Sequence, residues 1–414
     1  MMAAGPGRGG LALEDLRDSY PASDGDGAQP QPKFRWPASW NLRGRIRPAQ
    51  VADRVRRCGM PAGEDPSIVV TSDGRGSWQG VWRCESAWTC PACTTARRSR
   101  AATEIARGIA EIGEQEGEAW AQMVTLTIRH QRDVELAHAL EALGVAWYET
   151  RHDGTWCRWW RERVVASARA VEVTRGAHGW HPHIHLLLVL RGEPLDREHA
   201  MGAPGRWVGW ERDMLAERWM RAAARGPCGH DWTPTWLDGV HVSAPSHVSR
   251  ETCWTIAARY VTKAGLEVSG QGKARSPTSV WRIAERAAAG SDADRARWRE
   301  LSTATRGKHA IHVDPRMRVA CEAVSSEQRD DAASSERARV RVPVRLRAAL
   351  AWAERAWHPS ALRVPVALAE SGADVEAWLA ALERAHRTSD PSILAPWCVA
   401  LTMPGANEAA HHGA

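Results

Sequence analysis

One stretch of the chain decides its fold, and it reads G-W-H-P-H-I-H-L-L-L-V-L over residues 179–190. Alternate side chains of a β-strand lie on the same face, so His183 and His185 point to one side while Ile184 packs into the core on the other. Two imidazoles side by side form half of a site for a divalent metal ion. The alternative interpretation is a pair of surface histidines on a half-exposed strand.

A second β-like run, residues 170–174, precedes this strand. The five residues between the two runs, 175–179, include two glycines and favour a turn, so the pattern predicts a β-hairpin or closely paired strands. A metal site needs a further ligand from outside the histidine strand. Glu172 on the preceding strand is the best oxygen donor, with His181 or His178 as substitutes.

Tyr260 and Lys263 lie three residues apart in a stretch with helical periodicity, residues 250–264, which places them on one helical face. An ammonium beside a phenol would stabilise a phenolate or an attacked phosphate. A tyrosine packed against the sheet beside a solvated lysine is the alternative. The other two tyrosines are less suited, because Tyr20 lies in an aperiodic N-terminal arm and Tyr148 stands next to a carboxylate with no lysine nearby.

Four of the nine cysteines gather in the N-terminal third of the chain. An odd cysteine number without a signal peptide argues for reduced thiols or metal ligands and against a disulfide framework. A C-x2-C pair with two further cysteines has the ligand types of a structural zinc site, although the spacing departs from the common patterns. Unliganded, reduced thiols are the alternative. The predicted Zn²⁺ ligands are Cys58, Cys84, Cys90 and Cys93.

The formal net charge of +6 and the pI near 9.0 favour a polyanionic partner. Three arginines after the cysteines are predicted to contact a phosphate backbone, with a solvated helix face as the alternative: Arg97, Arg98 and Arg100. No apolar run approaches the roughly 20 residues that span a bilayer, and the N-terminus lacks the apolar region of a signal peptide. We therefore expect a cytoplasmic protein with no membrane partner.

Periodicity predicts helices over residues 101–114 and 135–160 and a strand over residues 123–128. Near the C-terminus, Asp374 is predicted to cap a helix with an apolar stripe. A length of 414 residues is enough for two or three packed units.

The order of three motifs in the chain resembles that of the HUH endonucleases: Thr125-Leu126-Thr127, then the histidine stretch, then Tyr260-x-x-Lys263. More narrowly, residues 84–318 resemble the replication initiator (Rep) proteins of rolling-circle plasmids found in actinobacteria. The resemblance implies an antiparallel sheet with His183 and His185 on a central strand, holding Mg²⁺ or Mn²⁺. It also implies that Tyr260 attacks the scissile phosphate, which yields a 5′-phosphotyrosyl link and a free 3′-OH.

The expected fold class is therefore α+β, with an antiparallel-sheet HUH domain, flanking helices, an N-terminal cysteine and zinc module and a helical C-terminal extension. The expected partners are single- and double-stranded origin DNA, and the C-terminal unit is expected to contact DNA or a host helicase. The predicted division is a disordered arm at 1–38, a zinc module at 39–110, a nicking and joining domain at 111–322, a linker at 323–338 and a helical unit at 339–414.

One position departs from the family pattern. Similar Rep proteins with one catalytic tyrosine can use a nearby glutamate to activate water, but Ile256 stands four residues before Tyr260, which leaves Glu251 or Glu267 for that role. Alternatives to an initiator are an HUH relaxase or transposase of a mobile element and a non-catalytic zinc-dependent DNA-binding protein. A (β/α)8 metal-dependent hydrolase would need eight strand–helix units, which the sequence does not contain.

Overall fold

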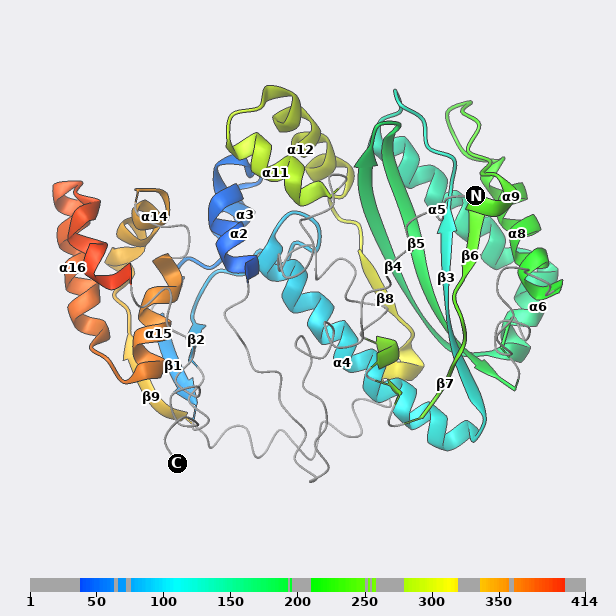
Figure 1. The fold of residues 1–414 in the computed structure, drawn as a ribbon, viewed down its shortest axis with the longest axis horizontal. Coiled ribbons are helices and arrows are strands. Elements are labelled where there is room, and N and C mark those ends of the chain that lie inside the picture. The colour runs from blue at the N-terminus through cyan, green and yellow to red at the C-terminus, as the bar shows by residue number, and fades with distance from the viewer. Residues whose placement is uncertain are drawn as a thin grey trace, which may run out of the picture.

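The computed structural model describes residues 38–62, 66–71, 76–192, 194–195, 210–249, 252–253, 255–257, 279–318, 336–356 and 361–398. The larger of two antiparallel sheets within these ranges has the strand order β6-β3-β5-β4-β8, with β7 paired to β3 (Figure 1). Its strands are β3 (Ala119–Thr127), β4 (Val164–Gly176), β5 (Gly179–Arg191), β6 (Val240–Val242), β7 (Ser246–His247) and β8 (Ile311–Val313).

Strands β4 and β5 form the predicted hairpin, and both are longer than the sequence indicated. Gly176 pairs with Gly179, so only Ala177 and His178 turn the chain. Gly179 has a φ of 92°, and a Cβ there would lie 2.5 Å from the carbonyl oxygen of Gln131. Only glycine tolerates both the positive φ and this close approach, so the residue fixes where β5 begins.

One face of this sheet is covered by α5 (Leu136–His152), α6 (Gly154–Arg163) and α8 (Trp210–Ala223). The even-numbered residues of β5 from Ile184 to Leu190 pack against these helices. The single helix predicted over residues 135–160 is wrong, because the chain breaks at Asp153. The backbone of Asp153 is extended, and its side chain accepts hydrogen bonds from the amides of Thr155 and Trp156, which starts α6 as a new helix.

The other face is covered by α4 (Pro91–Glu116), which extends the helix predicted over residues 101–114. The strands present small residues on this side, among them Ala119, Ala168 and Ala170, so that elements can pack closely on the sheet. Gly108 of α4 shows how tight this packing is, because a Cβ there would lie 2.7 Å from Cα of Met317. The odd-numbered residues of β5 lie on this face, with Leu187 and Val189 in the core beneath α4.

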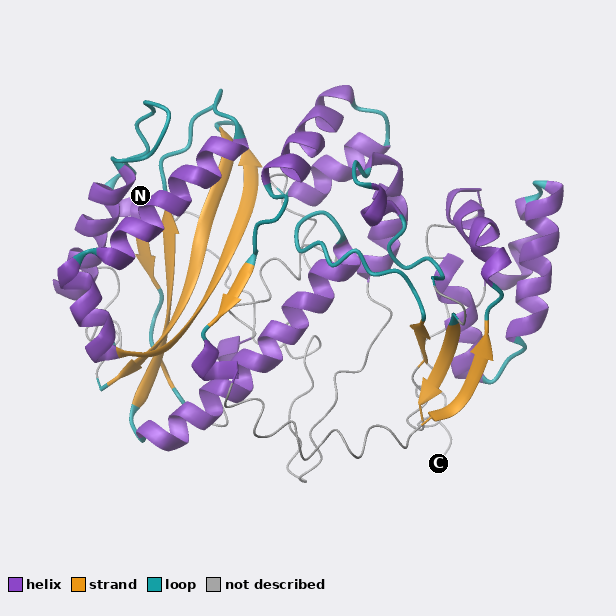
Figure 2. Cartoon of the chain, turned by 180° about the vertical axis from the view of Figure 1, so that it is seen from behind, coloured by secondary structure: helices purple, strands orange, loops and turns teal. Residues whose placement is uncertain are grey.

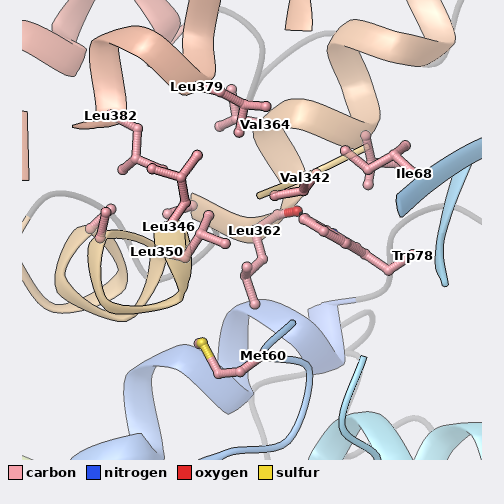
Figure 3. Packing of buried hydrophobic residues seen from close by; sticks show 14 of the residues in the cluster. Met60, Ile68, Trp78, Val342, Leu346, Leu350, Leu362, Val364, Leu379 and Leu382 are labelled. Carbon is pink, nitrogen blue, oxygen red and sulfur yellow. The ribbon is translucent and has the colours of Figure 1, made fainter. Parts of the chain in front are cut away.

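The smaller sheet joins distant parts of the chain, with the order β2-β1-β9. Seen from behind in Figure 2, its three strands lie beside the C-terminal helices, away from the larger sheet. Residues of both chain ends share one core, in which Ile68 and Trp78 meet Leu346, Leu350 and Leu382 (Figure 3). The elements are β1 (Ser67–Thr71), β2 (Gly76–Gln79), β9 (Glu336–Arg341), α14 (Arg347–Ala356), α15 (Val364–Ser371) and α16 (Val375–Thr388).

The structure differs from the predicted division of the chain in two ways. Helix α4 runs continuously through the boundary at residues 110 and 111, and β9 begins at Glu336, inside the predicted linker. The C-terminal unit is not purely helical, because β9 pairs with β1. Its helices bury their apolar stripes against the N-terminal module, so the two form one packed unit. The N-cap predicted at Asp374 is confirmed, since its carboxylate accepts from the amide of Ala377 at 2.9 Å.

A buried ion network ties the two chain ends together. Glu354 of α14 accepts from Arg43 at 2.6 Å and pairs with Arg47 as well, and its side chain is 1% exposed. Arg43 also donates to the carbonyl of Cys58. A buried carboxylate is tolerated only with such partners.

The remaining helices complete the described ranges, none of which contains a helix long and apolar enough to cross a membrane. A fourth core joins α2, α11 and α12 to α5 and the tip of the β4–β5 hairpin. The α-helices are α2 (Ala38–Ile46), α3 (Asp53–Arg56), α9 (Trp236–Gly239), α11 (Val280–Ala288) and α12 (Asp292–Ala304), and the 3-10 turns are η1 (Arg47–Ala49), η2 (Val344–Leu346), η3 (Ala361–Arg363) and η4 (Pro391–Cys398).

Candidate functional site

Glu172, His183 and His185 converge on the face of the large sheet that also packs against α4. Glu172 of β4 is paired in register with His183 of β5. The Oε2 atom of Glu172 lies 3.0 Å from Nε2 of His183 and 2.8 Å from Nε2 of His185. The two Nε2 atoms are 3.1 Å apart. The structure therefore brings together the three residues that the sequence singled out as metal ligands.

The three donor atoms have the spacing that a hard divalent ion requires. Ligands about 2.1 Å from an octahedral ion lie about 3.0 Å from their neighbours, which matches the triangle of donor atoms. All three residues are at most 7% exposed. Two imidazole nitrogens and a carboxylate oxygen form a site that leaves other coordination positions of an octahedral ion to further ligands.

The electrostatics of this cluster favour an ionised carboxylate. Burial by itself raises the pKa of the Glu172 carboxyl, but hydrogen bonds and attraction from His183 and His185 outweigh it and hold that pKa well below its usual range. A carboxylate that stays ionised while buried among imidazoles is ready to bind a cation.

Thr125 is a residue of this site that sequence reasoning missed. It faces His185 across β3 and β5, and its Oγ1 lies 3.1 Å from Nδ1 of that imidazole. The carbonyl of His181 lies 3.4 Å from Nδ1 of His183 in the same way. Contacts to Nδ1 orient the ring so that Nε2 points into the cluster. The sequence marked Thr125 as part of a β-branched run and of the first motif, but it did not show the register that places Thr125 beside His185.

The two substitute ligands, His181 and His178, lie outside the cluster. Both are instead near His130, with ring centroids 4.6 Å and 6.0 Å from its ring. Burial, followed by the nearby charge of His178, lowers the pKa of His130. Among the described residues, Glu172 is therefore the third member of the cluster.

The four predicted zinc ligands also meet, in the shared core of the two chain ends. Their sulfur atoms are buried and lie 3.5 Å apart for Cys58 and Cys93, 3.6 Å for Cys58 and Cys90, and 3.7 Å for Cys84 and Cys93. A tetrahedral zinc ion with Zn–S bonds of about 2.3 Å places its sulfur ligands about 3.8 Å apart. The donor types and spacing therefore suit a closed structural zinc site.

Local structure explains why these cysteines converge. Cys90 stands immediately before α4 and Cys93 lies in its first turn, while Arg54 holds the carbonyl of Cys84 at 2.7 Å. Hydrogen bonds from the other three cysteines, Cys84, Cys90 and Cys93, lower the pKa of the Cys58 thiol. A thiolate is the form that binds a metal ion.

The three arginines after the cysteines do not share one environment. Arg97 and Arg100 are exposed on α4, and Arg97 makes an exposed ion pair of 3.3 Å with Glu85. Arg98 is buried, with 9% of its surface exposed. Burial faces this side chain towards the protein, so the structure does not support the predicted phosphate contact of Arg98.

Tyr260 and Lys263 lie outside the described residues, as do Tyr20, Glu251 and Glu267. The chain just before Tyr260 is described in part. The amides of Cys253 and Ile256 bond to the carbonyls of Ser249 and Thr252, which is helical spacing, and Cys253, Ile256 and Ala257 pack on the α4 face of the sheet.

Tyr148 is placed differently. It is 60% exposed on α5, which covers the opposite face of the sheet from the Glu172 cluster, and its ring stacks on His152.

Part of the chain is similar in sequence to known replication proteins. Residues 76–214 match a family of replication proteins. A Rep protein of Streptomyces lividans is 31% identical over 153 residues, covering 30% of this chain and 33% of that protein. A neomycin resistance protein of Streptomyces cyanogenus is 28% identical over 181 residues, covering 37% of this chain and 41% of that protein. No solved structure matches the chain.

These matches confirm the resemblance to plasmid replication initiators of the actinobacterial type, over the part of the chain that they cover. The matched family segment contains Thr125, the Glu172 cluster and three of the four clustered cysteines. The chain matches less than half the length of either relative.

The contact between Thr125 and His185 can be tested through the affinity of the Glu172 cluster for Mn²⁺. We expect Thr125→Val to lower the affinity for Mn²⁺ by about 10- to 100-fold, because the imidazole loses the group that orients it. Isothermal titration of Mn²⁺ into each variant measures the effect. Thr127→Val is the matched control, since Thr127 is on the same strand opposite His183 and its side chain makes no hydrogen bond with the described residues. Equal affinities for all three proteins would contradict the role of Thr125.

The cysteine cluster is tested by metal content and heat stability. Elemental analysis should find one zinc ion per chain, and Cys90→Ser should lose zinc and unfold several degrees lower, because binding of a structural metal contributes to folding. Cys228→Ser, at an exposed cysteine outside the cluster, should change neither quantity. Wild-type protein purified without chelator and found free of zinc would contradict the assignment.

Proposed function

We propose that this chain is an HUH-type rolling-circle replication initiator, which nicks one strand of a plasmid origin and rejoins it. The observation that carries the proposal is the buried convergence of Glu172, His183 and His185 on neighbouring strands of an antiparallel sheet. The similarity of residues 76–214 to replication proteins supports the same assignment.

In this proposal Glu172, His183 and His185 hold Mg²⁺ or Mn²⁺. When bound, such an ion neutralises charge on the non-bridging oxygens of a scissile phosphate. The residues contribute a fixed, buried donor set, and Thr125 keeps the His185 ring in its orientation.

Tyr260 is the proposed nucleophile. Its phenolic oxygen forms a bond to the phosphorus atom, the bond from phosphorus to the 3′ oxygen breaks, and that oxygen leaves as a 3′-OH after taking a proton. The phenol proton passes to solvent or a base, and Lys263 offsets negative charge on the phenolate and the phosphate. The reverse reaction rejoins the strand.

Two observations support the choice of Tyr260. The last described residue before it, Ala257, packs on the sheet face that carries the Glu172 cluster. Tyr148 is on a helix of the opposite face. Glu251 or Glu267 is the residue that we propose activates a water molecule to end replication.

The cysteine cluster is proposed to hold a structural Zn²⁺ that orders the start of α4. Arg97 and Arg100, exposed on the following turns, would then contact DNA phosphates as positioning contacts. Origin DNA in single- and double-stranded form is the proposed partner, and a host helicase is a further candidate for the C-terminal unit.

The alternatives fit less well. A relaxase or transposase would share the metal cluster and the tyrosine, but residues 76–214 match replication proteins. A non-catalytic zinc-dependent DNA-binding protein would explain the cysteines and leave the buried Glu172 cluster without a role.

The nucleophile is tested with a single-stranded origin oligonucleotide and Mn²⁺. We expect Tyr260→Phe to abolish the covalent protein–DNA adduct seen on a denaturing gel, because the variant lacks the attacking oxygen. Tyr148→Phe is the control and should form the adduct at the wild-type rate. An adduct that survives boiling in detergent with Tyr260→Phe would show that another residue attacks.

A further inference from the structure

A basic groove lies where the N-terminal module meets α14, away from the Glu172 cluster. Its volume is about 710 Å³, within the range of roughly 300–1,000 Å³ that is common for ligand sites. Its walls carry four arginines and one tryptophan, its floor is apolar, and no acidic side chain lines it. The residues that matter are Arg47, Arg57, Trp82, Arg345 and Arg347, above a floor that includes Met60.

Trp82 is the unusual member of this groove, because 47% of its surface is exposed. Its backbone is held firmly, since its amide donates to the carbonyl of Met60 at 2.8 Å and its carbonyl accepts from the amide of Gly59 at 2.6 Å. Both bonds lie next to the cysteine cluster, as Cys58 precedes Gly59 and Cys84 follows two residues after Trp82. The backbone of Trp82 is therefore held beside the cysteine cluster, while its ring remains partly open to solvent.

The arginines differ in how far they are available to a ligand. Arg47 is bound to the buried Glu354 and forms part of the wall. Arg57 pairs with Asp53 and Arg345 with Glu383 at 3.7 Å, but both arginine side chains are about 70% exposed, at 68% and 71%. Exposed pairs of this kind contribute little, so a phosphate can replace the carboxylate. Arg347 makes no ion pair or hydrogen bond with the described residues.

We propose that this groove binds a segment of single-stranded DNA, with a base stacked on Trp82 and the neighbouring phosphates on Arg345 and Arg347. The inference rests on the proposed function, since it makes the groove a second DNA contact of the same protein. An exposed aromatic ring among cations, above an apolar floor, is the combination that binds unpaired bases and their backbone together. A duplex offers the phosphates but keeps its base faces stacked inside.

The position of the groove gives it a distinct role. Helix α14 lies at the opposite end of the molecule from β4 and β5 in Figure 1. A DNA strand held in this groove lies outside the proposed nicking site. The groove would therefore keep the DNA bound to the protein while the Glu172 cluster acts on another part of the same DNA.

The test measures binding of a fluorescent oligothymidylate of about 20 nucleotides to the full-length, zinc-loaded protein by fluorescence polarisation, without added Mg²⁺ or Mn²⁺. Trp82→Ala should weaken binding by roughly 5- to 150-fold, and Trp82→Phe should retain most of the affinity because it keeps a stacking ring. The double variant Arg345→Ala/Arg347→Ala should reduce the slope of log K against log salt by about 1.4, since each phosphate contact on a single strand contributes about 0.7.

Matched controls come from the other end of the molecule. Trp236→Ala, at a tryptophan of α9 that is 39% exposed, and Arg161→Ala, at an exposed arginine of α6, should each change affinity less than twofold. Zinc content and melting temperature confirm that the variants are folded. The affinity of Trp82→Ala for a duplex of the same length should be less than twofold lower than that of the wild-type protein.

Three results would overturn the proposal: wild-type affinity of Trp82→Ala for the oligothymidylate, the same loss with Trp236→Ala, or an unchanged salt slope in the double arginine variant. Failure of the proposed nicking activity is distinguishable from failure of this proposal, because the binding assay contains no added Mg²⁺ or Mn²⁺ and does not depend on strand cleavage. A protein that binds through Trp82 and forms no adduct would contradict the nicking function alone.

Discussion

The pairing of Glu172 with His183 across β4 and β5 is the constraint on which the site depends. Because side chains alternate along a strand, slipping this register by one residue would carry the histidines and the glutamate to opposite faces. Such a slip is unfavourable because Ile184 and Leu186 fill the apolar core under α5, and His183 and His185 would have to take their place there. Core packing on one face thus fixes the cluster on the other.

The two faces of the large sheet carry side chains of different size. Beneath α5, α6 and α8 lie large aliphatic and tryptophan side chains, which make a thick core. On the α4 side the strands present alanines, and Gly108 allows a close backbone approach. Small residues leave room on that face for the polar cluster and for Cys253, Ile256 and Ala257. Helix α4 begins at the cysteine cluster and so links the two units through one rigid element.

Local sequence patterns were enough to predict the hairpin, the cluster of Glu172 with His183 and His185, and the four cysteines that meet. Each depends on alternation or on the chemistry of a few rare residue types. The contact of Thr125 with His185 could not be predicted, because it depends on the register between strands that are distant in sequence. The pairing of β9 with β1 was missed for the same reason. The burial of Arg98 depends on how α4 packs, which helical periodicity in so arginine-rich a chain did not reveal.

Binding of a divalent ion by Glu172, His183 and His185 is the step on which the proposed nicking activity depends. The most direct measurement is anomalous X-ray diffraction at the manganese edge from crystals grown with Mn²⁺. We expect a single strong anomalous peak at about 2.0–2.2 Å from the Nε2 atoms of His183 and His185 and from a carboxylate oxygen of Glu172. A peak at another set of residues, with these three side chains still hydrogen-bonded to one another, would contradict this metal site.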